Sequence, residues 1–593
     1  MRLLKWKITL TVSLRSLRTL SSLLVQEDID EEAYSEIWSR AWPWIEFLGQ
    51  LTDPVTDAVN HSAYLRFIVA FSHREETVSV ISITSGVGYL IGRAWAHALL
   101  QTKTITALFE VSLALIMVDD LYKFIDELVD GVGGSWDSLA SIVMAHLYFV
   151  LDHGTDLKPE MSYISSGITA FLSEVLMNLD DFRDVLLRQG FVSVVIHITQ
   201  ARAVSLAGRN ALGDDEFDPV KMLQELVACW ISADRAPNSD QAQAIFIEAI
   251  QAGIFPTIFD CAALPDALNM ELQFKAIFVC CIPPLTMRRL VLVELDAIFP
   301  ELQRFDAVEY LSPQSLQMWR NFLAITAHNL NVLRWYNSVR NVPTLAACDN
   351  LGCAKVMARY ELWCCAGCRN ALYCGTACQK ADYKRPQLGH KELCSYLQSY
   401  KSKNQSGNLD LKFLRAVVHY DYRTNEQEIG MLLLKFLHAN PSTTPTVRFC
   451  LDYSTGRCSF SIEPLAMTEH IAPQRVQILR YFPWNEAIDQ TSPSALKYAH
   501  SDFWDRVQLH MLEIRYPSDS LAANVPSPSR SPGPGLIFPF RVACPGLVIG
   551  LRSLVASLPV YDPSNRHTID CDNHREVIRD LIAIEGLKTH YGH

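Results

Sequence analysis

Residues 348–394 read CDNLGCAKVMARYELWCCAGCRNALYCGTACQKADYKRPQLGHKELC and decide how this part of the chain folds. The stretch holds eight of the chain's sixteen cysteines, together with His390. The other eight cysteines lack the regular spacings of a disulfide framework, so the composition indicates a reducing, intracellular compartment, cytoplasm or nucleus. The stretch therefore predicts a metal site rather than a disulfide-bonded or redox segment.

The candidate ligands form four short-range pairs, which are Cys348 with Cys353, Cys365 with Cys368, Cys374 with Cys378, and His390 with Cys394. Thiolates two to four residues apart can bind one tetrahedral Zn²⁺, because a single turn points both sulfurs inward. Four pairs supply eight ligands, enough for two closed structural sites, and Cys364 is left over. The segment has too few large apolar residues to fold around a core of its own, so we expect two zinc ions per chain.

The order of the pairs, and above all ALYCGTACQKADYKRPQLGHKELC at 371–394, resembles the MYND-type zinc finger. The preceding helical region, including IWSRAWPWIEFL at 37–48, is similar to that of fungal MYND-finger proteins. The resemblance implies an interleaved arrangement in which one zinc binds Cys348, Cys353, Cys374 and Cys378, and the other binds Cys365, Cys368, His390 and Cys394. Spacing alone leaves a sequential pairing open.

MYND fingers are protein-interaction modules that hold short proline-containing peptides, so the resemblance implies a protein partner recognised through such a peptide. It also implies that Gln379 and Tyr383 flank the peptide groove, although Tyr383 stands where the family usually has Trp. The sequence thus predicts a zinc-binding interaction scaffold, which contacts its partner through an extended peptide.

Two alternatives belong to other classes. Some MYND fingers lie within lysine methyltransferases, but the residues after Cys394 contain no motif of the SET catalytic domain, so we expect no enzymatic activity. A nucleic-acid-associated transcriptional regulator is the second alternative. The chain carries a net charge of −12, and the finger's seven basic and four acidic residues, with zinc-bound thiolates, leave it near neutral. No direct nucleic-acid binding is expected, because phosphate binding needs a positive excess.

A chain of 593 residues is too long for one hydrophobic core. Residues 28–342 read as successive helices, and VLLRQGFVSVVI (185–196), AIQAGIFPTIF (249–259) and ITSGVGYLIG (83–92) each place a glycine between apolar stretches. This resembles the joints of armadillo-like α-solenoids. A helix starting at Asp218 and continuing to Ile231 is expected to precede another at 242–250, which Gly253 ends.

The remaining segments complete a mainly α fold. Residues 1–27 are basic and predict a helix that begins the helical domain, with mitochondrial targeting by residues 1–25 as the alternative. Residues 400–593 predict an α+β region, in which alternation over 447–462 indicates a β-hairpin and the Pro- and Gly-rich stretch 524–535 indicates a flexible loop. The longest uncharged stretch, 77–92, is shorter than the roughly 20 apolar residues of a membrane span, so we expect no membrane association.

Overall fold

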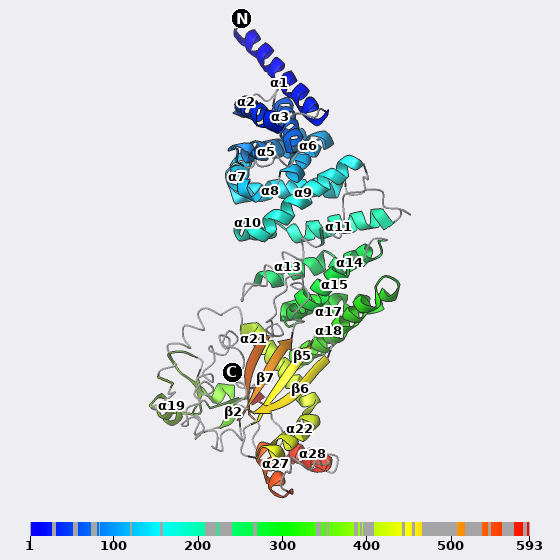
Figure 1. Ribbon diagram of the computed structural model, residues 1–593. Helices are drawn as coiled ribbons and strands as arrows, with labels where there is room; N and C mark the ends of the chain where they lie inside the picture. Colours follow the sequence, from blue (N-terminus) through cyan, green and yellow to red (C-terminus); the bar gives the residue numbers. More distant parts are fainter. Residues whose placement is uncertain are drawn as a thin grey trace. The chain divides into compact units, whose positions relative to one another are not determined.

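The structure is a computed structural model of the chain, which divides into two compact units. The first unit comprises Met1–Ile277 with Phe305–Ser312, and the second comprises Phe278–Arg304 with Pro313–His593 (Figure 1). The residues described are 2–26, 31–50, 57–72, 80–81, 83–118, 121–153, 158–207, 222–223, 240–264, 270–339, 345–348, 350, 353, 355–369, 371–384, 390–391, 394, 408–441, 445–452, 457–464, 507–515, 536–543, 547–559, 574–584 and 590–591.

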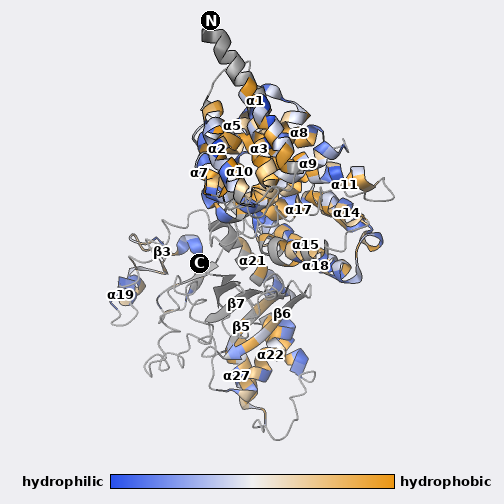
Figure 2. Cartoon of the chain, turned by 45° about the horizontal axis from the view of Figure 1, so that its top comes forward, coloured by the Kyte–Doolittle hydropathy of each residue, from blue (hydrophilic) through white to orange (hydrophobic). Residues whose placement is uncertain are grey.

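The first unit is helical throughout its described residues, which confirms the expected mainly α fold. Its α-helices are α1 (Arg2–Gln26), α2 (Glu31–Gln50), α3 (Asp57–Ser72), α5 (Val87–His97), α6 (Ile105–Met117), α7 (Ile125–Val132), α8 (Trp136–Asp152), α9 (Pro159–Asn178), α10 (Asp180–Arg188), α11 (Phe191–Ala207), α13 (Asp240–Gln251), α14 (Ile254–Ala262) and α15 (Met270–Lys275). Most of them carry apolar and polar residues together (Figure 2). On α8, for example, the fully buried Leu139, Val143 and Leu147 recur every four residues, which is the spacing of one helix face.

Glycine turns join several of these helices, as the sequence pattern predicted. Gly86, Gly190 and Gly253 all have φ between +83° and +92°, a left-handed conformation that only glycine adopts at little cost. The chain bends by 76° between α10 and α11 and by 70° between α13 and α14. Helices also contact partners further along the chain, because α6 packs against α9, α8 against α11, and α11 against α14. The described part of the unit therefore contains two bent helix pairs, and several of its helices also pack against helices further along the chain.

Two of the turns are tied to a later helix by a carboxylate. Glu127 on α7 accepts hydrogen bonds from the N–H groups of Gly86 (2.9 Å) and Gly88 (3.0 Å) at the start of α5. Glu248 on α13 accepts from the N–H (2.9 Å) and the hydroxyl (2.8 Å) of Ser193 at the start of α11. The first N–H groups of a helix have no hydrogen-bond partner within the helix and carry a partial positive charge. A carboxylate accepts their hydrogen bonds and also neutralises part of that charge.

A buried histidine bridges three helices of the first unit. The Nδ1 of His146 on α8 lies 3.2 Å from the indole Nε1 of Trp95 on α5, and its Nε2 lies 3.2 Å from the carbonyl oxygen of Ile164 on α9. Because the indole N–H can only donate and the carbonyl can only accept, the ring is neutral with its proton on Nε2. Burial lowers the pKa of His146 to about 3, which keeps it neutral.

The N-terminal residues 2–26 form α1, whose buried Leu14, Leu17 and Leu24 face the unit, and α1 contacts α3. Of the helix expected over 218–231, Met222 and Leu223 are described and buried, and the rest lies outside the described residues. Among the described residues no single helix is long and apolar enough to cross a membrane, and only the bent pairs α10–α11 and α13–α14 reach that length and composition together.

The second unit combines helices with a five-stranded sheet. Outside the cysteine-rich stretch, its described α-helices and sheet strands are α16 (Ile282–Leu285), α17 (Arg289–Arg304), α18 (Pro313–Val339), α21 (Asn408–Thr424), α22 (Glu426–Ala439), β5 (Pro445–Asp452), β6 (Arg457–Pro464), β7 (Val507–Arg515), β8 (Leu536–Ala543), α27 (Leu547–Ala556), α28 (Arg575–Ile584) and β9 (His590–Tyr591). The strand order is β6-β5-β7-β8-β9, in which only β5 and β7 run parallel. Helix α22 contacts β5, β6, α27 and α28.

The predicted hairpin is β5 and β6, which pair antiparallel with Val447 opposite Ile462 and Phe449 opposite Phe460. These are the residues that the alternation placed on one face, and Val447 and Phe449 are fully buried. The expected loop at 524–535 lies outside the described residues. The division between the units falls inside the helical stretch 28–342, since α17 and α18 group with the residues that follow them.

Helices α18 and α21 pack together, and in the sequence they lie on either side of the cysteine-rich stretch. The ring centroids of Trp335 and His419 lie 5.1 Å apart, and those of Tyr336 and Phe413 lie 6.0 Å apart. His328 of α18 contacts Asp421 near the end of α21, whereas Tyr336, further along α18, contacts Phe413 nearer the start of α21, so the two helices run antiparallel. In the sequence, residues 340–407, which include every candidate ligand, lie between the two helices.

Candidate metal centre

Short strands and one helix position four of the eight candidate ligands. Strand β1 (Leu345–Ala347) pairs with β2 (Val356–Ala358), and β3 (Trp363–Cys364) pairs with β4 (Leu372–Tyr373), both antiparallel. Cys348, Cys365 and Cys374 each come directly after one of these strands, which fixes their direction. Helix α19 (Thr376–Tyr383) carries Cys378 in its first turn.

Four sulfurs converge in the first cluster, formed by Cys348, Cys353, Cys374 and Cys378. The Sγ of Cys374 lies 3.5 Å from the Sγ of Cys353 and 3.5 Å from that of Cys378. The backbone N–H of Cys374 also donates to the Sγ of Cys348, at 3.4 Å. All four sulfurs lie within 4.8 Å of one another.

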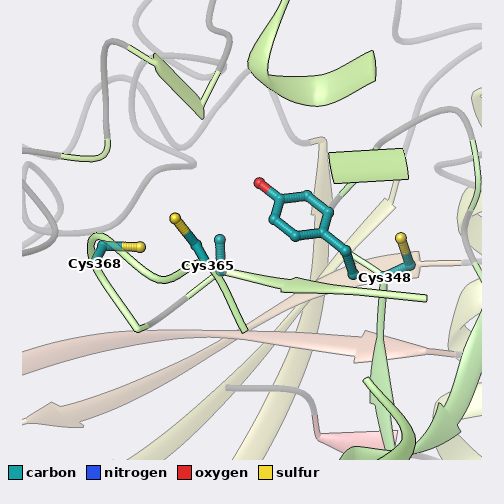
Figure 3. Packing of buried hydrophobic residues seen from close by; sticks show 5 residues of the cluster. Cys348, Cys365 and Cys368 are labelled. Atoms are coloured by element: carbon teal, nitrogen blue, oxygen red, sulfur yellow. The ribbon is translucent and has the colours of Figure 1, made fainter. Parts of the chain in front are cut away.

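Three sulfurs and one ring nitrogen form the second cluster, from Cys365, Cys368, His390 and Cys394. The Sγ atoms of Cys365 and Cys394 are 3.8 Å apart, and the Sγ of Cys368 lies 3.5 Å from the Nε2 of His390. These four ligand atoms also lie within 4.8 Å of one another. Figure 3 shows Cys365 and Cys368 close together, and Cys348 apart from them.

The distances fit metal coordination. Four thiolates about 2.3 Å from one Zn²⁺ lie about 3.8 Å apart, and an imidazole nitrogen at about 2.1 Å lies about 3.6 Å from a thiolate. A disulfide would bring two sulfurs to about 2.05 Å, and these cysteines are not joined by disulfides. The grouping is interleaved, with the first and third pairs in one cluster and the second and fourth in the other. Cys364 belongs to neither cluster and is exposed.

The electrostatics of the clusters favour a bound cation. Burial, followed by hydrogen bonds with neighbouring thiols, raises the pKa of Cys374 to about 11, and burial first raises that of Cys394 to about 11 as well. Burial also raises the pKa of Cys348. Burial would lower the pKa of His390, but the nearby Cys368 raises it to about 9. Hydrogen bonds, first that from Asn350, lower the pKa of Cys378, and burial would raise that of Cys365 but is outweighed by hydrogen bonds, which lower it. The protein alone therefore favours one thiolate in each cluster over several, whereas a divalent cation stabilises them together.

The apolar interior of this segment is small. Among its described residues, one buried group comprises Cys348, Cys365, Cys368, Ala371 and Tyr373, and a second comprises Leu362 and Leu372. Three of the first five are candidate ligands, so the remaining apolar contacts are few. Bound metal would supply the folding free energy that so small a core lacks.

Gly367, between two ligands, is a site residue that the ligand spacing did not reveal. A Cβ built on Gly367 would lie 2.8 Å from the Sγ of Cys394 and 3.8 Å from that of Cys365. The first distance is shorter than real Cβ contacts, and a sulfur held by a metal cannot move away. A glycine inside a Cys-x-x-Cys turn is the sequence signal that would have identified this constraint.

A buried hydrogen bond within the segment was also not predicted. The hydroxyl of Tyr373 on β4 donates to the Oδ2 of Asp382 on α19 over 2.8 Å. Tyr373 is fully buried and Asp382 is 6% exposed. The Tyr373 ring also packs edge-on against the ring of His390, with centroids 5.9 Å apart. No sequence pattern identifies this pair, because the two residues lie on different elements.

The two predicted peptide-binding residues lie on α19. Gln379 follows Cys378 directly and is half-buried, and Tyr383 ends the helix with 45% of its surface exposed. Residues four apart occupy the same face of a helix, so the two side chains share one face. Trp363 on β3 is also exposed, at 59%.

Compared with protein-family models, curated proteins and solved structures, the chain matched none of them. The site is therefore defined by its own geometry, as two adjacent Cys/His clusters that could each hold a metal ion.

Proposed function

We propose that the chain is a zinc-binding protein-interaction scaffold, in which a MYND-type finger with two zinc ions recognises a proline-containing peptide of a partner protein. The observation that carries the proposal is the pair of closed four-ligand clusters beside an exposed helix face. The helical region is proposed to be armadillo-like, supported by its glycine turns and by the contacts between successive helix pairs.

The donor set supports zinc and a structural role for it. Cys₄ and Cys₃His are donor sets of tetrahedral zinc sites, and soft thiolates disfavour magnesium and calcium. A catalytic zinc keeps one coordination position for water or substrate, whereas each cluster here offers four protein ligands. This supports a scaffold rather than an enzyme.

The exposed face of α19 supports peptide recognition. Tyr383 offers a flat apolar ring to a proline or leucine, and the Gln379 amide can both donate and accept hydrogen bonds. In the described part of the chain β3 pairs with β4 alone, which leaves an edge where an extended peptide could add a strand. A proline-rich peptide has little backbone freedom left to lose, so a shallow surface can bind it.

The metal proposal is tested by elemental analysis of the purified full-length chain. We expect two zinc ions, and substitution of Cys365 by Ser should lose at least one of them. The adjacent Cys364→Ser is the matched control, because the Cys364 side chain is exposed and outside both clusters. One zinc or none in the wild-type chain, or equal effects of the two substitutions, would refute the proposal.

The peptide proposal is tested by calorimetric titration of the full-length chain with a PxLxP peptide. We expect a Kd in the micromolar range or weaker, corresponding to about 8 kcal/mol or less. Gln379→Ala and Tyr383→Ala should each weaken binding. Tyr148→Ala on α8 is the control, because that tyrosine is 48% exposed and belongs to the first unit. Absence of binding, or unchanged binding by both α19 variants, would exclude this face as the recognition surface.

A further inference from the structure

Helix α19 is attached to the rest of the finger at both of its turns. Its first turn carries Cys378, a member of the first cluster. Its last turn carries Asp382, which accepts the 2.8 Å hydrogen bond from Tyr373. An eight-residue helix is too short to be stable by itself, so these attachments determine its orientation.

Tyr373 lies next to both metal clusters and to α19. It precedes Cys374 of the first cluster directly, its ring packs against His390 of the second cluster at an interplanar angle of 77°, and its hydroxyl binds α19. Within the described residues, α19 contacts β4, the strand that ends at Tyr373. One buried side chain thus joins both metal clusters to the helix that carries Gln379 and Tyr383.

We infer that Tyr373 is a positioning residue for partner recognition, which fixes the rotation of the α19 face through its hydrogen bond to Asp382. The inference rests on the proposed peptide-binding function. Asp382 directly precedes Tyr383, so a change in the last turn of α19 moves the proposed contact residue.

The chemistry of the pair supports positioning over simple packing. A carboxylate and a phenol are costly to bury, and an apolar pair of similar size would pack without that cost. A hydrogen bond to a charged acceptor is directional, whereas an apolar contact allows the helix to rotate. The Tyr373–Asp382 pair therefore provides orientation that an apolar contact would not.

The test compares Tyr373→Phe, Asp382→Asn and Asp382→Leu in the full-length chain. Tyr373→Phe keeps the ring beside His390 and removes only the hydroxyl, so zinc content should remain at the wild-type value. We expect it to weaken the affinity for the PxLxP peptide about 10-fold. Asp382→Leu should weaken the affinity to a similar extent. Asp382→Asn retains an acceptor oxygen, so it should keep most of the wild-type affinity. Tyr360→Phe is the control, because Tyr360 is exposed.

Amide hydrogen exchange separates this inference from the peptide function. At the start of α19 the N–H of Gln379 donates to the carbonyl oxygen of Gly375, and at its end the N–H of Lys384 donates to that of Lys380. Tyr373→Phe should accelerate exchange in the last turn with both metals bound. If exchange is faster in Tyr373→Phe but the wild type binds no peptide, the hydrogen bond of Tyr373 does hold the last turn of α19, and the proposed peptide function is wrong. Unchanged exchange and affinity in Tyr373→Phe, or loss of zinc from it, would overturn the inference.

Discussion

Mild acid should destabilise the helical unit through its buried histidines. His146 is fully buried and His61 is 6% exposed. Burial lowers the pKa of His146 to about 3, and burial together with the nearby His97 and Arg93 lowers that of His61 to about 3 as well. An exposed histidine in the unfolded chain has a pKa near 6.5. Between these two pKa values the unfolded state binds more protons, so the free energy of unfolding falls as the pH drops below 6.5.

The size of the effect follows from the two pKa values. Between about pH 7.5 and about pH 5.5, one histidine that stays neutral in the folded state loses about 1.4 kcal/mol of stability. His146 and His61 together should lose about 3 kcal/mol, a large part of the roughly 5–15 kcal/mol that stabilises a domain. The effect is absent above the unfolded pKa, where both states are neutral.

The substitution His146→Gln removes the part of this pH-dependent loss of stability that is due to His146. A glutamine can accept from the Trp95 indole and donate to the Ile164 carbonyl, but it does not titrate. Urea unfolding of both proteins, followed by far-UV circular dichroism across the pH range, should show the variant losing about 1.4 kcal/mol less than the wild type. Equal pH dependence of the two proteins would refute the reasoning.

Three further predictions concern the finger and the helix joints. Cys374→Ala should remove metal and unfold the finger while the far-UV circular dichroism of the helices changes little, since the first unit has its own core. Gly367→Ala should reduce zinc content by about one ion by crowding the second cluster, whereas Gly375→Ala, where a Cβ meets nothing within 4 Å, should retain both; elemental analysis distinguishes them. Glu248→Ala leaves the Ser193 N–H without this acceptor and should cost about 1–3 kcal/mol in urea unfolding; no loss would contradict the capping role.

Local patterns in the sequence were sufficient to predict a mainly helical fold, the glycine turns between helices and the β5–β6 hairpin. A left-handed turn such as that at Gly253 needs glycine, and a buried strand face needs an apolar residue at every second position, so both leave short-range signals. The parallel pairing of β5 with β7 joins residues about sixty positions apart, such as Val447 with His510, and no local pattern specifies it.

The ligand residues could be predicted for a similar reason. A metal ion constrains residue type and spacing, so all eight members of the clusters are visible as four short pairs. Residues that act through shape or through a partner on another element leave a weaker signal, such as the glycine of the Cys-x-x-Cys turn, or none, as for Tyr373. Gly367 matters because of the Cys394 sulfur, and Tyr373 matters because of Asp382 on the next element.

The packing of α18 against α21 has a consequence for how the finger acquires its metal. The His328 Nε2 and the Asp421 Oδ1 lie 2.9 Å apart, and this pair, with the Trp335–His419 and Tyr336–Phe413 ring contacts, holds together the two helices that flank the insertion, without any metal ligand. A finger that has lost its metal therefore stays a closed loop instead of a free tail. Its eight ligands remain tethered at an effective concentration on the order of millimolar, so once one ligand has captured a zinc ion from solution, the others reach that ion in intramolecular steps.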